Sequence, residues 1–172
     1  MASLFVLPSA ARKSSFLLLC AVLACLFLGM AKKPTITVRF FAEANKLDSE
    51  RFSKPLTFHN PPREGYIETV PTIHERYFKA VYPFQAKDGT WGCAFKLDNS
   101  GRLNLEVVST ERRGTVLVAF VGTKLGVHQV VELLIDKPIR DGIISIPHGL
   151  TELEIAAITK EWPVIGQTKK RK

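Results

Sequence analysis

The sequence predicts an α+β domain, an antiparallel sheet with two helices packed on one face, preceded by an N-terminal hydrophobic leader helix. Three observations support this class. Apolar and polar residues alternate in several short segments, the period of a half-buried strand. Residues 151–154 carry the signals of a helix start. Residues 16–31 are apolar without interruption. At 172 residues the chain suffices for one domain with its own core.

The leader comes first along the chain. Residues 16–31, FLLLCAVLACLFLGMA, follow two basic residues and end in small ones, which is the plan of a secretory signal cleaved after Ala31. An uncleaved membrane anchor is the alternative, because 16 residues lie between a signal core and a full span. Lys32 and Lys33 favour retention, since positive charges resist translocation.

Two further interpretations of the leader remain. Cys25 in VLAC approximates a bacterial lipobox, in which the thiol is lipidated. The run could also be a buried helix of a cytosolic domain. The favoured interpretations place the body outside the cytoplasm, in the periplasm or cell envelope, either secreted or anchored. Cys20 and Cys25 leave Cys93 alone in the body, so no intrachain disulfide can form there and we expect a small buried strand residue.

Charge is concentrated at the two ends of the chain. The first 33 residues carry four bases and no acid, and the last four residues are all basic. Residues 34–168 are therefore balanced, with 16 basic and 16 acidic side chains. A nucleic-acid groove needs cations spread over one face, so we expect no nucleic-acid partner. The basic tail, residues 167–172, is a solubilising end or a weak contact for a polyanion.

The first half of the body reads as strands and loops. Residues 35–44 alternate as a half-buried strand, and residues 45–65 are mostly loop with one edge strand at PLTF. Residues 66–70 form another short strand. Residues 75–84 alternate as a strand, with a helical turn near their start as an alternative.

The second half holds the clearer elements. Residues 91–97 form a strand that a turn at 99–101 ends, and RLNLEVVSTERRG gives a short helix stopping at Gly114. The apolar run 115–122 is a central strand, and HQVVELLIDKPI pairs with it before Pro138 marks an edge.

The best local signals lie in DGIISIPHGLTELEIAAI, residues 141–158. Residues 142–146 form a strand, a turn containing His148 follows, and Thr151 and Glu154 form a capping box that starts a helix. Leu150 and Ile155 occupy the two positions of a hydrophobic staple. Pro163 closes the helix region. These features have structural reasons, so the stretch indicates a fold rather than a reaction.

No motif of nucleophilic, phosphate-binding or zinc chemistry is present. The chain has four histidines without ligand spacing: His59, His74, His128 and His148. We therefore expect no catalytic residues, no metal and no cofactor.

Five residues remain as binding candidates. Trp91 and Tyr82 could line a peptide-binding surface, although aromatics at strand positions usually face a core. Arg112 and Arg113 could hold an anion at a helix end, where the helix dipole alone also favours cations. His148, exposed in its predicted turn, could titrate near neutral pH.

Two segments carry a resemblance to a known family. They are CAFKLDNSGRLNLEVVSTERRGTVLVAFV and LIDKPIRDGIISIPHGLTELEIAAI. The matching positions are Gly101, Thr110, Gly114, Pro138, Ile139, Gly142, Ile146, Gly149, Thr151, Glu154, Ile155 and Ala156. The pattern resembles the head of the first periplasmic domain of SecD-type protein-export proteins. It divides the chain into a leader (1–31), a strand and loop extension (34–79), a SecD-head-like domain (80–166) and the basic tail.

SecD proteins carry six membrane spans and assist export together with SecF, whereas this chain has at most one span. The resemblance therefore implies a stand-alone envelope domain that contacts polypeptide. We predict a non-enzymatic exported or membrane-anchored domain that binds a polypeptide or envelope protein, with the membrane reached through residues 16–31. The alternatives are a small extracytoplasmic hydrolase using His148 or His128, and polyanion binding through the basic ends.

Overall fold

The computed structural model describes residues 35–45, 47–49 and 51–166. The predicted leader helix, the lipidation candidate Cys25 and the basic tail lie outside the described residues.

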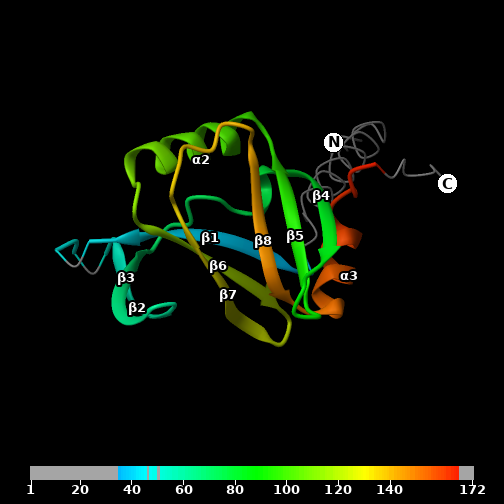
Figure 1. Cartoon of the computed structure of the whole chain (residues 1–172), viewed down its shortest axis with the longest axis horizontal. Coiled ribbons are helices and arrows are strands. Elements are labelled where there is room, and N and C mark those ends of the chain that lie inside the picture. The colour runs from blue at the N-terminus through cyan, green and yellow to red at the C-terminus, as the bar shows by residue number, and fades with distance from the viewer. Residues whose placement is uncertain (1–34, 46, 50, 167–172) are drawn as a thin grey trace, which may run out of the picture. The chain divides into compact units, whose positions relative to one another are not determined.

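Within the described residues the strands form two antiparallel sheets (Figure 1). The five-stranded sheet has the order β2-β3-β1-β6-β7 and the three-stranded sheet the order β4-β5-β8. The first sheet comprises β1 (Thr37–Ala44), β2 (Ser53–His59), β3 (Pro62–Glu68), β6 (Val116–Thr123) and β7 (Gly126–Leu134). The second comprises β4 (Phe78–Gln85), β5 (Trp91–Leu97) and β8 (Ile143–Leu150). With α2 (Asn99–Glu111) and α3 (Glu152–Glu161), this confirms the α+β class.

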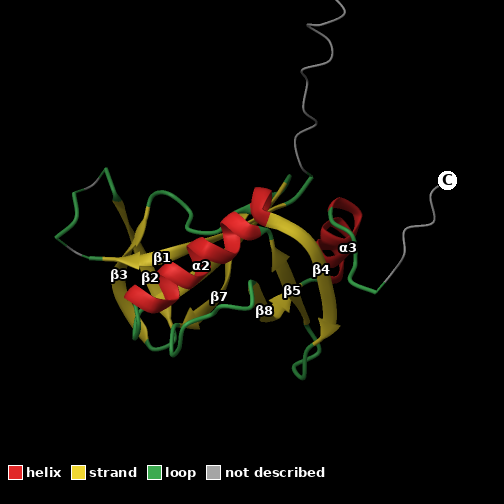
Figure 2. Cartoon of the chain, turned by 90° about the horizontal axis from the view of Figure 1, so that it is seen from above, coloured by secondary structure: helices red, strands yellow, loops and turns green. Residues whose placement is uncertain are grey.

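One apolar core joins both sheets and both helices. Alternation along β1 turns Val38 and Phe40 inward, and the Phe40 ring meets Phe95 of β5 edge to face with centroids 6.2 Å apart. Leu105 of α2 and Ile158 of α3 are fully buried in the same cluster. Figure 2 shows the helices at separate places in the fold, with α3 beside β4. The two sheets are thus held by side chains drawn from both halves of the sequence.

A second, smaller core lies on the other face of the five-stranded sheet. The β2–β3 hairpin folds over this face and buries Phe58 and Ile67 against Val118 of β6. Glu132 of β7 fastens the hairpin turn, because its carboxylate accepts the backbone N–H groups of His59 at 2.7 Å and Asn60 at 3.1 Å. A charged acceptor makes such bonds stronger than neutral ones.

Several predicted elements are confirmed. A single 3-10 turn, Glu75–Tyr77, precedes β4, as the alternative for that segment proposed. β2 is an edge strand, and β6 lies inside its sheet between β1 and β7. Both halves of the capping box are formed, with the Glu154 N–H donating to the Thr151 hydroxyl at 3.3 Å and the Thr151 N–H donating to the Glu154 carboxylate at 2.9 Å.

Three predicted boundaries are wrong. Residues 99–101 are the first turn of α2 rather than a turn that precedes it, because the Asp98 carboxylate accepts the Gly101 N–H at 2.7 Å and caps the helix. β3 begins at Pro62, since it pairs with β2 along its whole length. β8 continues through His148 to Leu150, with an irregular register opposite Trp91 and Gly149 at φ +91° where a side chain would be strained.

The capping box gives the first testable prediction. Thr151→Ala removes the hydroxyl that accepts a backbone N–H of α3, and we expect the free energy of unfolding to fall by about 1 kcal/mol. Denaturant unfolding measures this change. Thr151→Ser keeps the hydroxyl and should retain most of the stability, whereas equal losses in both variants would show that the hydroxyl does not act as a cap.

Candidate binding site

A groove beside α2 combines apolar side chains with hydrogen-bonding groups. We call it the α2 groove. It has a volume of about 430 Å³ and runs between α2 and the segment that connects β3 to β4. Its lining includes Val70, Thr72, His74, Tyr77, Asn104 and Val107.

Aromatic and polar contacts fix one wall of the α2 groove. The rings of His74 and Tyr77 stack with centroids 4.1 Å apart, and the Asn104 amide donates to the Tyr77 hydroxyl at 3.2 Å. His74 Nδ1 in turn accepts the Arg76 N–H at 3.3 Å. These contacts restrain both ring orientations, so the wall is shaped before any ligand arrives.

Thr72 brings an unused polar atom to the α2 groove. Its backbone N–H donates to the Phe40 carbonyl at 2.9 Å, which ties the residue to β1. Its hydroxyl oxygen is buried and has no hydrogen-bond partner among the described residues. Leaving such a group unpaired costs about 1–3 kcal/mol. A ligand donor or acceptor would recover part of that cost once the groove wall opened enough to reach this buried oxygen.

Apolar side chains at the rim of the α2 groove face solvent. Val70 is 70% exposed and Val107 of α2 is 52% exposed. Together with the aromatic wall and the Thr72 hydroxyl, they offer both burial and hydrogen bonding, which is the usual make-up of a recognition site. The sequence signal for this surface is faint, because Val107 directly precedes the buried Val108 in α2 although its own side chain is exposed.

His74 is held neutral in this wall. Burial lowers the pKa of His74, and the nearby cations Arg76 and Arg39 lower it further, while Glu75 and Asp98 oppose them. The imidazole therefore stays uncharged at neutral pH, where its Nδ1 can accept the Arg76 N–H.

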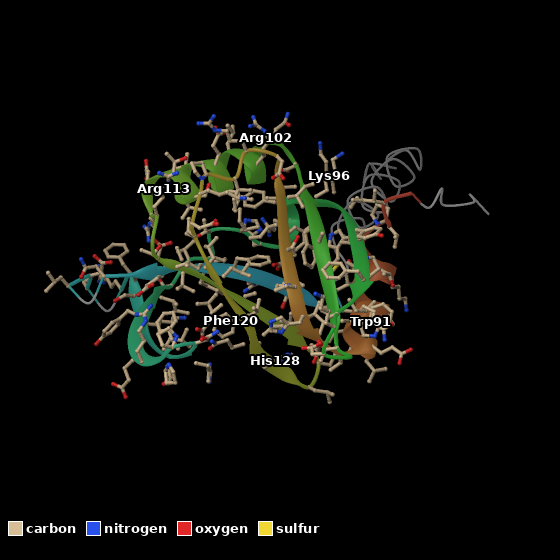
Figure 3. The ribbon with its side chains drawn as sticks, in the orientation of Figure 1. Trp91, Lys96, Arg102, Arg113, Phe120 and His128 are labelled. Atoms are coloured by element: carbon tan, nitrogen blue, oxygen red, sulfur yellow. The ribbon has the colours of Figure 1, made fainter. Side chains whose placement is uncertain are left out.

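The predicted anion-binding arginines behave differently from one another. Arg112, at the edge of the α2 groove, donates to the Glu43 carbonyl at 3.0 Å and pairs with the Glu68 carboxylate. These contacts fasten the end of α2 to β1 and β3. Arg113 is exposed at the end of α2 (Figure 3). The pair therefore does not converge on one site.

The other predicted residues lie elsewhere. Trp91 packs against the core at the start of β5, far from Arg113 on the opposite side of the molecule (Figure 3). Tyr82 is exposed on β4. His148 lies 3.7 Å from Asp88, and both side chains are about half exposed, so their attraction is weak. The five candidates do not form a single surface.

A second groove lies at the turn between β6 and β7. We call it the tip groove; it has a volume of about 600 Å³. Its lining includes Thr35, Leu125, Val127, His128, Leu153 and Glu154. Sequence reasoning missed it, although apolar residues in a hairpin turn and at a helix start were a usable signal.

The polar contacts of His128 do not form a hydrolytic triad. His128 Nε2 lies 3.4 Å from the Glu154 carboxylate, whose other oxygen accepts the Thr151 hydroxyl at 2.9 Å. The carboxylate therefore stands between histidine and hydroxyl. Nucleophilic catalysis needs the reverse order, with the histidine between the nucleophile and the acid.

Cys93 and the potential metal ligands form no further site among the described residues. Cys93 is fully buried on β5, as predicted, and burial raises the pKa of its thiol to about 12. Among residues 35–45, 47–49 and 51–166, no three histidine, cysteine or acidic side chains gather around a possible metal position. None of the helices in that part of the chain combines the length and apolarity needed to span a bilayer.

No protein-family model matches the chain, and no curated protein matches it either. Solved structures that are similar to it include two of SecDF. The crystal structure of SecDF in super-membrane-facing form has a TM-score of 0.48 and 15% identity, over 76% of this chain and 20% of that chain. The chain thus spans about a fifth of that protein's length.

The second structure is of the membrane component SecDF that enhances protein export. It has the same TM-score of 0.48 and identity of 15%, over 94% of this chain and 74% of that chain. The predicted SecD resemblance is confirmed in this distant form. We therefore infer what this chain binds from its own residues.

His74 predicts a pH dependence of stability. Because its folded pKa is lowered, the unfolded chain binds more protons near the ordinary histidine pKa of about 6.5, so stability falls as the pH drops through that range. His74→Asn keeps an acceptor for the Arg76 N–H but cannot titrate. We expect denaturant unfolding of the variant to weaken less than that of the wild type between about pH 7.5 and 5.5. Identical pH profiles would contradict the assignment.

Proposed function

We propose that the chain is a non-enzymatic, extracytoplasmic domain of the cell envelope that binds an extended polypeptide in the α2 groove. In this proposal residues 16–31 are retained and hold the domain at the membrane. The observation that carries the proposal is the buried, unpartnered Thr72 hydroxyl beside the exposed side chains Val70 and Val107.

The chemistry of the α2 groove fits a polypeptide segment. An extended chain presents backbone N–H and C=O groups at regular intervals, and one of them could pair with the Thr72 hydroxyl. Apolar side chains of the segment would cover Val70 and Val107. The aromatic wall of His74 and Tyr77 is uncharged on its histidine side, while Glu111 and the Arg112–Glu68 pair bring charges to the groove. The motif resemblance to SecD heads implies the same class of partner.

The charge pattern supports tethering rather than binding of a polyanion. Residues 34–168 carry equal numbers of acids and bases, so the body has no net attraction for a charged polymer. The uninterrupted apolar run and the Lys32–Lys33 pair that follows it favour a retained anchor.

Two variants of α2 test the proposal. Val107→Glu places a charge in the groove, whereas Leu103→Glu places one on the same helix outside it, and the two side chains are 52% and 51% exposed. With full-length protein in detergent, we expect Val107→Glu to weaken binding of a fluorescent, reduced and carboxymethylated polypeptide at least about tenfold, a loss of roughly 1.4 kcal/mol. Fluorescence anisotropy gives the Kd, and Leu103→Glu should leave it unchanged.

A further variant distinguishes a loss of binding from a loss of folding. Thr72→Val removes the hydroxyl but keeps the shape, so we expect it to be at least as stable as the wild type and to bind the polypeptide more weakly. Equal binding by the wild type, Val107→Glu and Thr72→Val would refute the α2 groove as the site.

A further inference from the structure

We infer that the tip groove rests on the bilayer surface, with Leu125, Val127 and Leu153 in contact with lipid. The inference relies on the tether proposed above but concerns a different surface from the α2 groove. Its partner is a lipid bilayer rather than a polypeptide.

The exposure of these side chains is the first observation. Leu125 is 98% exposed, Leu153 is 82% exposed and Val127 is 72% exposed. All three line the same groove, whose surface is mostly apolar. Single exposed leucines are ordinary, but a gathered apolar surface marks a place where water is excluded by a partner.

The short link between the apolar run and the tip groove indicates a lipid bilayer as the partner. Thr35 lines the tip groove, and only residues 32–34 separate it from the apolar run that ends at Ala31. Four extended steps from Ala31 to Thr35 reach at most roughly 14 Å. A compact body of this size is roughly 35 Å across. If run 16–31 is an anchor, the link to Thr35 is therefore short enough for the tip groove to reach the bilayer.

The chemistry of the tip matches an interface between lipid and water. Leu125 and Lys124 lie in the turn between β6 and β7, so an apolar side chain and a cation project from one loop. Lysine extends its charge toward headgroups while apolar neighbours enter the acyl boundary. Leu153 approaches from the first turn of α3. On the groove wall the Glu154 carboxylate lies 3.4 Å from His128 Nε2 and accepts the N–H and hydroxyl of Thr151 at 2.9 Å, so both of its oxygens have polar neighbours within the protein.

The test uses full-length protein in vesicles of phosphatidylethanolamine and phosphatidylglycerol. Cys20→Ala and Cys25→Ala leave the buried Cys93, and single cysteines at positions 125, 153 or 107 then carry an environment-sensitive fluorophore. We expect the probes at 125 and 153 to shift to the blue and to be quenched several-fold by nitroxide lipid. The probe at 107, on α2, should show neither effect.

Flotation of the same samples separates the two proposals. Vesicles that float with protein, combined with unquenched probes at 125 and 153, would overturn the bilayer contact while leaving the tether intact. Protein that does not float would overturn the tether and, with it, this inference. Probes that shift to the blue without lipid quenching would also overturn it, because a protein segment would then fill the groove. Leu125→Glu combined with Leu153→Glu should abolish quenching of a probe at 127 without abolishing flotation.

Discussion

The arrangement depends on β1, the central strand of the five-stranded sheet, which also contacts the three-stranded sheet where Phe40 meets Phe95. It pairs with β6 along most of its length and with β3 at its end. Its inward residues, including Phe40, lie in the large core, while Phe41 on the other face packs edge to face on Phe120 at 5.6 Å. The Phe40 carbonyl also accepts the backbone N–H groups of Thr72 and Ile73 at 2.9 and 3.2 Å. One strand therefore connects the five-stranded sheet, the β2–β3 hairpin and the wall of the α2 groove.

The tip groove and the α2 groove lie near different positions along β1. Thr35, before the start of β1, lines the tip groove, and Thr72 is bonded to Phe40 five residues later, roughly 17 Å further along. Most of the lining surface of the tip groove is apolar, and Leu125, Val127 and Leu153 are its most exposed apolar side chains. The α2 groove contains the buried, unpartnered hydroxyl of Thr72 and an aromatic wall in which the Asn104 amide donates to the Tyr77 hydroxyl. Such a mixture of polar and apolar groups suits the mixed chemistry of a polypeptide. In the arrangement that we propose, the tip groove contacts the membrane and the α2 groove binds a polypeptide.

Local patterns in the sequence predicted the elements that depend on neighbouring residues. The capping box of Thr151 and Glu154, the alternation of β1 and the apolar run of β6 all form as expected. Features that depend on distant contacts were missed. The residues at 99–101 resemble a turn until Asp98 is seen to cap them, and the glycine and proline near the end of β8 resemble a turn although β5 pairs with the strand there. The grooves form only where segments from different parts of the chain meet. The division into two sheets could not be predicted either, because an alternating pattern shows that a segment is a strand but not which strand it pairs with.

The central claim is that the two ends of the domain face different partners, and photocrosslinking in native membranes tests it most directly. A benzophenone amino acid replaces Leu153 in one full-length variant and Val107 in another, and the adducts formed on irradiation are identified by mass spectrometry. We expect lipid adducts from position 153 and polypeptide adducts from position 107. Polypeptide adducts from position 153 together with none from position 107 would contradict it.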